Sequence, residues 1–241
     1  MKKPALLLCA FVLALVMAVP AWAGIKEDWD AALAALDRRD FQTVLNLTNR
    51  LIQYGKLNRP SLARVHTVRG VAYRFTGNHQ AALADFYKAI EANPQFSFAY
   101  FQRGNTWIEQ QKWDYAMWDF SKAIQLNPRL ADAYWNRSVC FQKKGQMAEA
   151  MRDQQTYCQL TPNDPKGRER LAFLQNRGGG QAPPPAPGGY NQQQQPNTNN
   201  QQPGGYNQQQ PANNQQPGGN GGFRLNSGAK DLADNFDLKE K

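Results

Sequence analysis

AALADFYKAIEANP at residues 81–94 and YAMWDFSKAIQLNP at residues 115–128 are two copies of one segment, and they stand 34 residues apart. In each copy a small residue, an aromatic residue and a second small residue follow at spacings of four and three, and a proline closes the segment. The matched positions are Ala82 and Ala116, Phe86 and Phe120, Ala89 and Ala123, and Pro94 and Pro128. Residues at this spacing share one face of an α-helix, and proline cannot continue a helix interior. Each copy therefore predicts a helix with one buried face that ends at its proline.

The same period covers residues 63–164 without a gap. Its three units are residues 63–96, 97–130 and 131–164. Each unit holds two stretches of helical apolar periodicity, separated by a break near Gly77, Gln111 or Gly145, which predicts a helix, a tight turn and a second helix. A single hairpin cannot bury its apolar face, but stacked hairpins can, so the repeat predicts an all-α solenoid.

With these columns the chain resembles the tetratricopeptide-repeat (TPR) family, whose second helix is very similar to the two quoted segments. The resemblance implies a right-handed superhelical solenoid in which the first helix of each unit lines a concave groove. The third unit departs from the pattern, since Gln154 and Tyr157 stand where the family has an aromatic residue and an alanine. Such a departure is typical of a terminal repeat that meets a different neighbour.

The sequence on either side of these units predicts a TPR domain at residues 24–177. Residues 25–62 resemble a degenerate first unit, with its connection to the next unit about four residues too long and the next helix expected to begin at Leu62. Residues 165–177 carry apolar residues spaced for one more helix, which we interpret as the solvating cap that repeat arrays need.

Residues 1–23 have the layout of a secretory signal peptide: two lysines, an apolar run to Val19, and Ala21-Trp22-Ala23 before the expected cleavage site. The apolar run is shorter than the about 20 residues of a membrane span. Cleavage would leave 218 residues (241 minus 23), beginning at Gly24, and would lower the net charge from +9 to +7. We therefore expect export to a bacterial periplasm without a stable membrane anchor; an uncleaved N-terminal anchor is the alternative.

Residues 178–222 consist almost entirely of Gln, Asn, Pro and Gly and carry no charge. This composition cannot bury a core, so the sequence predicts a disordered linker. Residues 223–241 return to apolar residues among charges, and Leu232 and Phe236 would share a face of a helix. We interpret this end as a short linear motif on a tether, or alternatively as a merely soluble terminus.

Two charges recur with the period. Arginine precedes the glycine column in each unit, and aspartate follows sixteen residues later on the second helix. The pairs are Arg69 and Asp85, Arg103 and Asp119, and Arg137 and Asp153. We expect a ladder of ion pairs between helices, because the guanidinium fork binds a carboxylate at two points. Independent surface charges are the alternative.

Catalytic chemistry is not indicated, and we expect no enzyme, cofactor or metal site. His66 and His79 fall on columns where aromatic residues stand in the next unit, so both are expected to pack against neighbours. Cys140 and Cys158 would lie at levels roughly 10 Å apart on antiparallel helices, beyond the about 7 Å between Cα atoms that a disulfide allows. The sequence therefore predicts two buried free thiols.

The resemblance also implies where a partner binds. By column, the predicted groove residues are Arg64, Arg74, Phe98, Phe101, Asn105, Ile108, Trp135, Asn136 and Lys143. Aromatic rings flanked by amides suit an extended peptide, although Phe98 in particular could instead pack between repeats. Some relatives capture a carboxylate with lysines and asparagines, but Phe101 stands where that clamp needs a lysine. We therefore expect no carboxylate capture of that kind.

These features together predict an exported scaffold or assembly factor that binds peptide or protein segments in its groove. The alternative is a protein that binds a cell-envelope polymer, peptidoglycan or polysaccharide, through aromatic and basic side chains. No cluster of basic residues with interleaved aromatics indicates nucleic acid as a partner.

Overall fold

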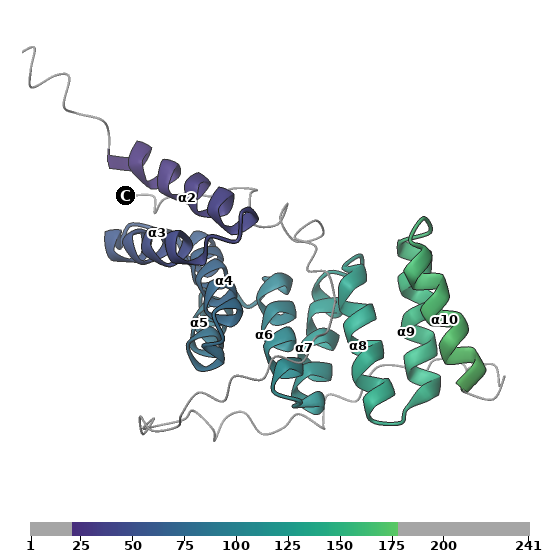
Figure 1. Ribbon diagram of the computed structural model, residues 1–241. Coiled ribbons are helices and arrows are strands. Elements are labelled where there is room, and N and C mark those ends of the chain that lie inside the picture. The colour runs from purple at the N-terminus through teal and green to yellow at the C-terminus, as the bar shows by residue number, and fades with distance from the viewer. Residues whose placement is uncertain (1–20, 178–241) are drawn as a thin grey trace, which may run out of the picture. The chain divides into compact units, whose positions relative to one another are not determined.

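The computed structural model describes residues 21–177, which form nine α-helices and no β-strand (Figure 1). They are α2 (Ala21–Asp37), α3 (Phe41–Tyr54), α4 (Arg59–Phe75), α5 (His79–Ala92), α6 (Ser97–Glu109), α7 (Trp113–Leu126), α8 (Ala131–Lys143), α9 (Met147–Leu160) and α10 (Pro165–Arg177). Most of the expected signal peptide, the linker and the C-terminal motif lie outside the described residues. None of the helices in residues 21–177 is long and apolar enough to cross a membrane.

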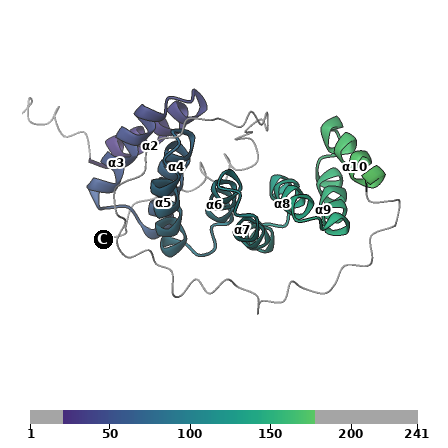
Figure 2. The ribbon, with the colours of Figure 1, turned by 60° about the horizontal axis from the view of Figure 1, so that its bottom comes forward.

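The described residues belong to two compact units, 21–106 and 107–177, whose boundary lies within α6. In the first unit α2 packs on α3, α3 on α4, and α4 on α5. In the second, α7 packs on α8, α8 on α9, and α9 on α10. Figures 1 and 2 show the hairpin partners α4 and α5, and α8 and α9, running side by side. The predicted fold class, an all-α array of helix-turn-helix repeats, is therefore confirmed.

The turns inside the three repeats share one backbone conformation. Gly77, Gln111 and Gly145 all adopt positive φ, at 80°, 57° and 78°. The N–H of each donates to the carbonyl three residues before it. The N–H of the following residue donates to the carbonyl five residues before itself, as when Asn78 donates to Tyr73 at 2.8 Å. Arg39, at φ 59°, occupies the same place between α2 and α3. The breaks expected near these residues are thus confirmed, and the degenerate first hairpin uses the same turn.

Helix α4 begins at Arg59 and not at Leu62, so the expected start was about one turn too late. The reason is a cap that the sequence interpretation overlooked: the Asn58 side chain accepts a hydrogen bond from the Ser61 N–H at 2.8 Å. Pro60 lies in the first turn of the helix. A proline there sacrifices no helical hydrogen bond, because the first N–H groups have no intrahelical partner.

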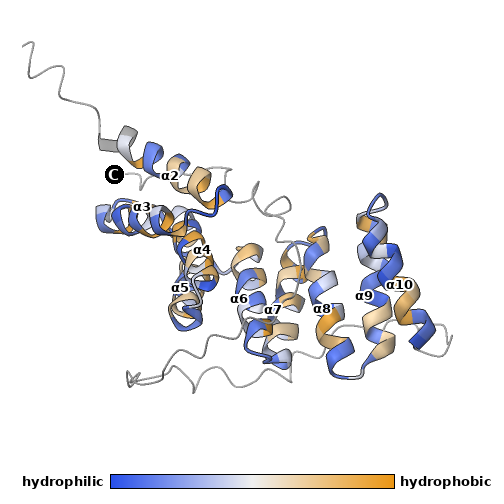
Figure 3. Ribbon diagram, in the orientation of Figure 1, coloured by the Kyte–Doolittle hydropathy of each residue, from blue (hydrophilic) through white to orange (hydrophobic). Residues whose placement is uncertain are grey.

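The core follows the columns of the repeat. Ala82, Phe86 and Ala89 on α5 are fully buried, and so are Ala116, Phe120 and Ala123 on α7. Every helix carries both hydrophobic and hydrophilic residues, as expected of amphipathic helices with one buried face (Figure 3). Gly70 of α4 is buried against α5, and a Cβ atom there would lie 2.7 Å from Cε1 of Phe86. The small column therefore lets α4 and α5 approach each other closely.

The third unit keeps this packing with different residues. Ser138 takes the glycine position, and its hydroxyl lies 3.3 Å from Oε1 of Gln154, which takes the phenylalanine position. Gln154 in turn donates from Nε2 to the carbonyl of Gly167 on α10 at 3.1 Å. Tyr157 also packs on Gly167, where an added Cβ would lie 2.8 Å from its ring. The departures from the repeat pattern thus fit α9 to the lone helix α10.

Candidate functional site

The predicted groove residues divide between the two compact units. The first unit holds Arg64, Arg74, Phe98, Phe101 and Asn105, and the second holds Ile108, Trp135, Asn136 and Lys143. Among them Arg74, Phe98 and Phe101 are buried, Lys143 is exposed, and the other five are half-buried. The predicted groove residues therefore differ in how much of each side chain a ligand can reach.

The aromatic residues of the first unit pack mainly on one another. The ring of Phe98 lies 6.3 Å from that of Phe96 and 6.0 Å from that of Phe101, centroid to centroid. Phe98 is 3% exposed and Phe101 is 6% exposed. Such rings stabilise the unit and leave little surface for a ligand, which favours the packing alternative for Phe98.

A bridge between arginine and glutamine joins successive first helices in each unit. In the first unit Arg74 of α4 donates from Nη2 to Oε1 of Gln102 on α6, at 3.5 Å. In the second unit Arg170 of α10 donates from Nη2 to Oε1 of Gln142 on α8, at 2.9 Å. Positions 74 and 142 belong to one repeat column, and positions 102 and 170 to another, two periods apart. The same bridge thus occurs twice with the arginine and the glutamine exchanged.

Arg170 of the second unit combines contact with an aromatic ring and burial that lowers its pKa. Its guanidinium lies over the ring of Trp135, 5.1 Å from the centroid, a cation–π arrangement. Its Nε is buried without a hydrogen-bond partner, and among residues 21–177 no carboxylate lies within ion-pair distance. Burial lowers the pKa of Arg170. The second unit therefore holds a half-buried positive charge that its own described acids do not neutralise.

Trp135 is held in place for such a contact. It is half-buried on α8, and its ring meets the ring of Tyr157 on α9 edge to face, with centroids 4.9 Å apart. The Tyr157 hydroxyl donates to Oδ2 of Asp164 at 2.6 Å, which fixes the second ring. A rigid aromatic surface beside a guanidinium can bind an apolar side chain and an acidic group together. We call Trp135, Gln142 and Arg170 the Arg170 site.

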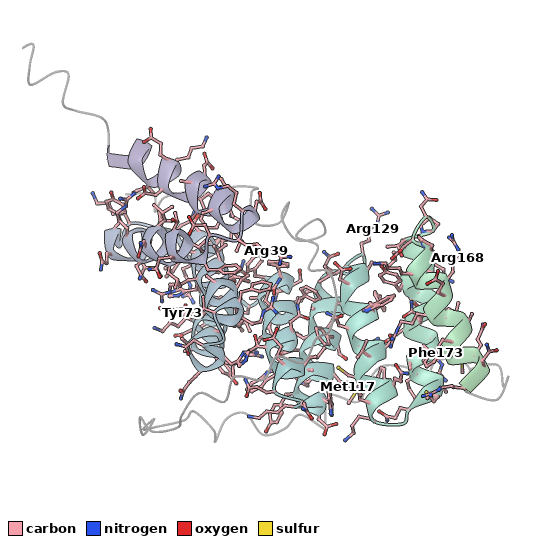
Figure 4. All side chains as sticks on the ribbon, in the orientation of Figure 1. Arg39, Tyr73, Met117, Arg129, Arg168 and Phe173 are labelled. Atoms are coloured by element: carbon pink, nitrogen blue, oxygen red, sulfur yellow. The ribbon has the colours of Figure 1, made fainter. Side chains whose placement is uncertain are left out.

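Sequence reasoning by column placed Trp135 and Gln142 in the groove but missed Arg170. Residues 165–177 were interpreted only as a solvating cap, although the period places Arg170 on the column of Asn136 and Gln102. Extending the column count by one more period would have drawn attention to it. Figure 4 labels Arg168 near the start of α10, where it points away from the neighbouring helices. Two arginines on one helix therefore have opposite surroundings.

The predicted ladder of ion pairs is present in one hairpin of each unit. Arg69 donates from Nε and Nη2 to both oxygens of Asp85, at 2.7 Å each. Arg137 binds Asp153 in the same way, at 2.7 and 2.8 Å. The aspartate side chains are 4% and 8% exposed. The alternative of independent surface charges is thus excluded for these two pairs.

Each arginine of the column also reaches the second helix of the preceding repeat. Arg69 donates from Nη1 to Oδ1 of Asn49 at 2.6 Å, and Arg137 donates to the Ser121 hydroxyl at 2.9 Å. Arg103 lies over the Tyr87 ring, 4.5 Å from the centroid. Asn49, Tyr87 and Ser121 hold equivalent positions on their helices, so the column links neighbouring repeats as well as the helices within one repeat.

Asp85 has a second side-chain partner besides Arg69. Nδ1 of His66 lies 2.9 Å from Oδ1 of Asp85, and the position of His66 is taken by Tyr134 two repeats later. Burial opposes ionisation of Asp85, but hydrogen bonds from Arg69 and His66 outweigh it and lower its pKa. Burial outweighs the hydrogen bond from Arg137 and raises the pKa of Asp153. The expectation that His66 simply packs was incomplete, because it belongs to a buried polar network.

The two described cysteines, Cys140 and Cys158, are both free, as predicted. Burial raises the pKa of the Cys140 thiol to about 12. Cys158 is only half-buried, so the prediction that both are buried was wrong for this residue. It lies on α9, which the lone helix α10 covers only in part. Among residues 21–177 no group of three or more His, Cys, Asp or Glu residues is placed to hold a metal ion.

The helical hairpins and their recurring residue columns define a helical-repeat protein. Comparison with known protein families specifies the kind of repeat. The family model described as "Tetratricopeptide repeat" matches residues 63–96 and 131–164. These are two of the units whose boundaries the sequence predicted. The chain therefore contains tetratricopeptide repeats.

Among curated proteins, tetratricopeptide repeat protein 6 of Homo sapiens is 40% identical over 50 residues, which is 21% of this chain and 10% of that protein. The chain thus matches about a tenth of the length of that relative. Among solved structures, a MamA fragment from Desulfovibrio magneticus RS-1 aligns with a TM-score of 0.56 and 18% identity, over 65% of this chain and 86% of the fragment. A second MamA structure gives a TM-score of 0.55 and 16% identity, over 65% and 83%. At these identities the likeness supports the fold alone.

Proposed function

We propose that this protein is an exported, non-catalytic interaction module, a scaffold or assembly factor, that binds an extended acidic peptide or protein segment on the first helices of its repeats. The Arg170 site carries this proposal. A half-buried guanidinium without a described carboxylate is an incomplete arrangement, because a charge withdrawn from water gains most from an ionic partner. A ligand with a carboxylate would supply that partner.

The neighbouring side chains specify the rest of the ligand. Trp135 offers a half-buried ring to an apolar side chain, and the Gln142 amide can hydrogen-bond a peptide backbone. An acidic residue one or two positions from an apolar residue would fit this combination. The sequence argues only against carboxylate capture by a clamp of lysines and asparagines. A single arginine on α10 is a different means of capture, which does not need the lysine that Phe101 replaces.

Selection from a random ten-residue peptide library against residues 24–241, and in parallel against residues 24–222, in which the C-terminal segment cannot compete, tests the proposal. We expect the enriched peptides to share Asp or Glu next to Leu, Ile or Phe. Arg170→Gln should weaken their binding by about 1.5–3 kcal/mol, the range of a charge-assisted hydrogen bond, or roughly 10- to 100-fold in Kd. Arg168→Gln is the matched control, because it removes an exposed arginine from the same helix.

Three outcomes are informative. Acidic peptides that lose affinity only with Arg170→Gln support the proposal. A library without enrichment, or peptides that bind both variants as well as they bind the wild type, contradicts it. Sedimentation with isolated wall material that depends on Arg170 when no peptide is enriched would favour the cell-envelope polymer instead.

Export is a separate part of the proposal and rests on the residues of the N-terminus. The pair of lysines, the apolar run and the small residues at 21 and 23 support it. A periplasmic location would place the Arg170 site among secreted and envelope proteins, which are then the source of the acidic segment.

A further inference from the structure

We propose that the C-terminal segment of this same chain, residues 230–241, is a ligand of the Arg170 site and competes there with external partners. This inference rests on the proposed function, because it assigns a second ligand to the same site. The segment would lower the apparent affinity of the Arg170 site for external partners, because each partner must first displace a segment of the same chain.

The segment has the chemistry that the site accepts. Its sequence is KDLADNFDLKEK, with three aspartates at residues 231, 234 and 237 and the apolar residues Leu232, Phe236 and Leu238 between them. A carboxylate can pair with the guanidinium of Arg170 while the adjacent leucine or phenylalanine packs on the Trp135 ring. The acidic and apolar residues alternate closely enough for one short segment to do both.

The charges of the two partners are complementary. The segment 230–241 carries four acidic and three basic side chains, a net charge of −1 (3 minus 4), and its three aspartates gather within residues 231–238, where no basic side chain lies. Helix α10 carries four basic residues and one acidic residue, a net charge of +3. The connecting residues 178–222 carry no charge, so they neither screen the segment nor compete with it. Opposite charge attracts this part of the tail towards the helix that bears Arg170.

The covalent connection supports binding within one chain. The tail leaves the described residues at Arg177, seven residues after Arg170 on the same helix, a distance of about 10 Å at 1.5 Å per residue. The 53 residues from 178 to 230 (230 minus 177) would span roughly 36–44 Å as a flexible chain of this composition. A tether that exceeds the distance it must cover gives an effective concentration in the millimolar range. Even a weak contact would then be largely occupied.

A fluorescein-labelled peptide of residues 228–241 tests the inference by fluorescence anisotropy at low salt. The protein is used as the mature chain, residues 24–241, and as the chain ended after residue 222, which retains every described helix. We expect the shortened chain to bind the peptide at least tenfold more tightly than the full chain, whose own segment competes. In the full chain, Asp231→Asn, Asp234→Asn and Asp237→Asn together should restore tight binding.

Arg170→Gln in the shortened chain should weaken the peptide at least tenfold, and Arg168→Gln should change it less than twofold. Circular dichroism checks that each variant keeps its helices. Equal affinity of the full and shortened chains, or no dependence on Arg170, would overturn the inference. Dimers of the full chain that increase with concentration and vanish on shortening would show that the segment binds a second copy, which also overturns binding within one chain.

The two proposals fail in different ways. If the library yields acidic peptides that require Arg170 but the peptide of residues 228–241 does not bind, only the further inference is wrong. If the library yields no peptide that requires Arg170 and the peptide of residues 228–241 does not bind either, the Arg170 site is not a peptide site. The proposed function then fails together with the further inference.

Discussion

Gly70 on α4 faces the ring of Phe86 on α5 so closely that no larger side chain fits there without a shift. The contact explains why the repeat pairs a small column with an aromatic column sixteen residues later. The third unit has a different pair at these two columns: Ser138 fits at the glycine position because Gln154 replaces the phenylalanine ring. Packing inside a repeat is therefore determined by the combined volume of the side chains at the two columns and not by the volume of either one alone.

We predict that Gly70→Ala lowers the free energy of unfolding by about 1–3 kcal/mol, because the added Cβ would lie 2.7 Å from the Phe86 ring and overpacking costs about that much. The intrinsic helix preference of alanine offsets only part of this cost. Urea unfolding followed by circular dichroism measures the change.

Gly24→Ala is the matched control, since nothing lies within 4 Å of a Cβ at that position on α2. It should leave stability unchanged or slightly raise it. The double variant Gly70→Ala with Phe86→Leu should lose less than the two single changes added together, because the smaller side chain makes room. Additive losses would show that the two residues are not in direct contact.

Among the elements, hairpins are joined by ion pairs as well as by packing. Arg137 of α8 binds Asp153 of α9 at two points and also reaches Ser121 of α7, so three helices share one guanidinium. A buried pair of this kind contributes little net stability, yet removal of one partner leaves the other charge without compensation. The column is therefore best understood as a device that fixes the register of successive helices.

We predict that Arg137→Met lowers the free energy of unfolding by about 3–5 kcal/mol at pH 7, because Asp153 is left buried without its partner. The loss should shrink as the pH falls. A buried carboxyl whose folded pKa lies above its unfolded value destabilises the fold above that folded pKa, and the penalty disappears towards the unfolded value of about 3.9. The pKa of Asp153 is already raised by burial while Arg137 is present.

Urea unfolding at pH 7 and at pH 5 measures this effect. Lys144→Met is the control, because Lys144 and Asp114 are both exposed and the loss of their ion pair should matter little at either pH. In the wild type, Asp85 should behave in the opposite way: its lowered pKa gives stability that is present at neutral pH and is lost as acid protonates it. An Arg137→Met loss that is the same at both pH values would contradict the argument.

At the scale of the whole molecule, the fold could be predicted from sequence far better than the site. The 34-residue period specified which helices pair, because small, aromatic and proline columns recur without gaps. The start of α4 was missed because a single side chain, Asn58, decides it. Periodicity describes a helix interior well, but a cap depends on one hydrogen bond that no period records.

The Arg170 site was harder to predict for a physical reason. Its members Trp135, Gln142 and Arg170 lie on two helices that are not adjacent in sequence, and glutamine and arginine are ordinary surface residue types. What distinguishes Arg170 is burial without a described carboxylate, which depends on three-dimensional packing. Columns predicted the aromatic part of the site, but charge balance could be judged only after the helices were placed.

The N-terminus bears on where the whole molecule works, and it yields a prediction about the mature chain. If residues 1–23 are a signal peptide, protein recovered from the exported fraction of its native host should begin at Gly24, because Ala21 and Ala23 supply the small residues that the peptidase reads. Intact-mass measurement and N-terminal sequencing determine this directly. Ala23→Asp, which places a charge at the cleavage site, should leave the longer form attached to the membrane. An intact N-terminus in wild-type protein extracted only with detergent would support the uncleaved anchor, and intact protein in the cytoplasm would contradict export altogether.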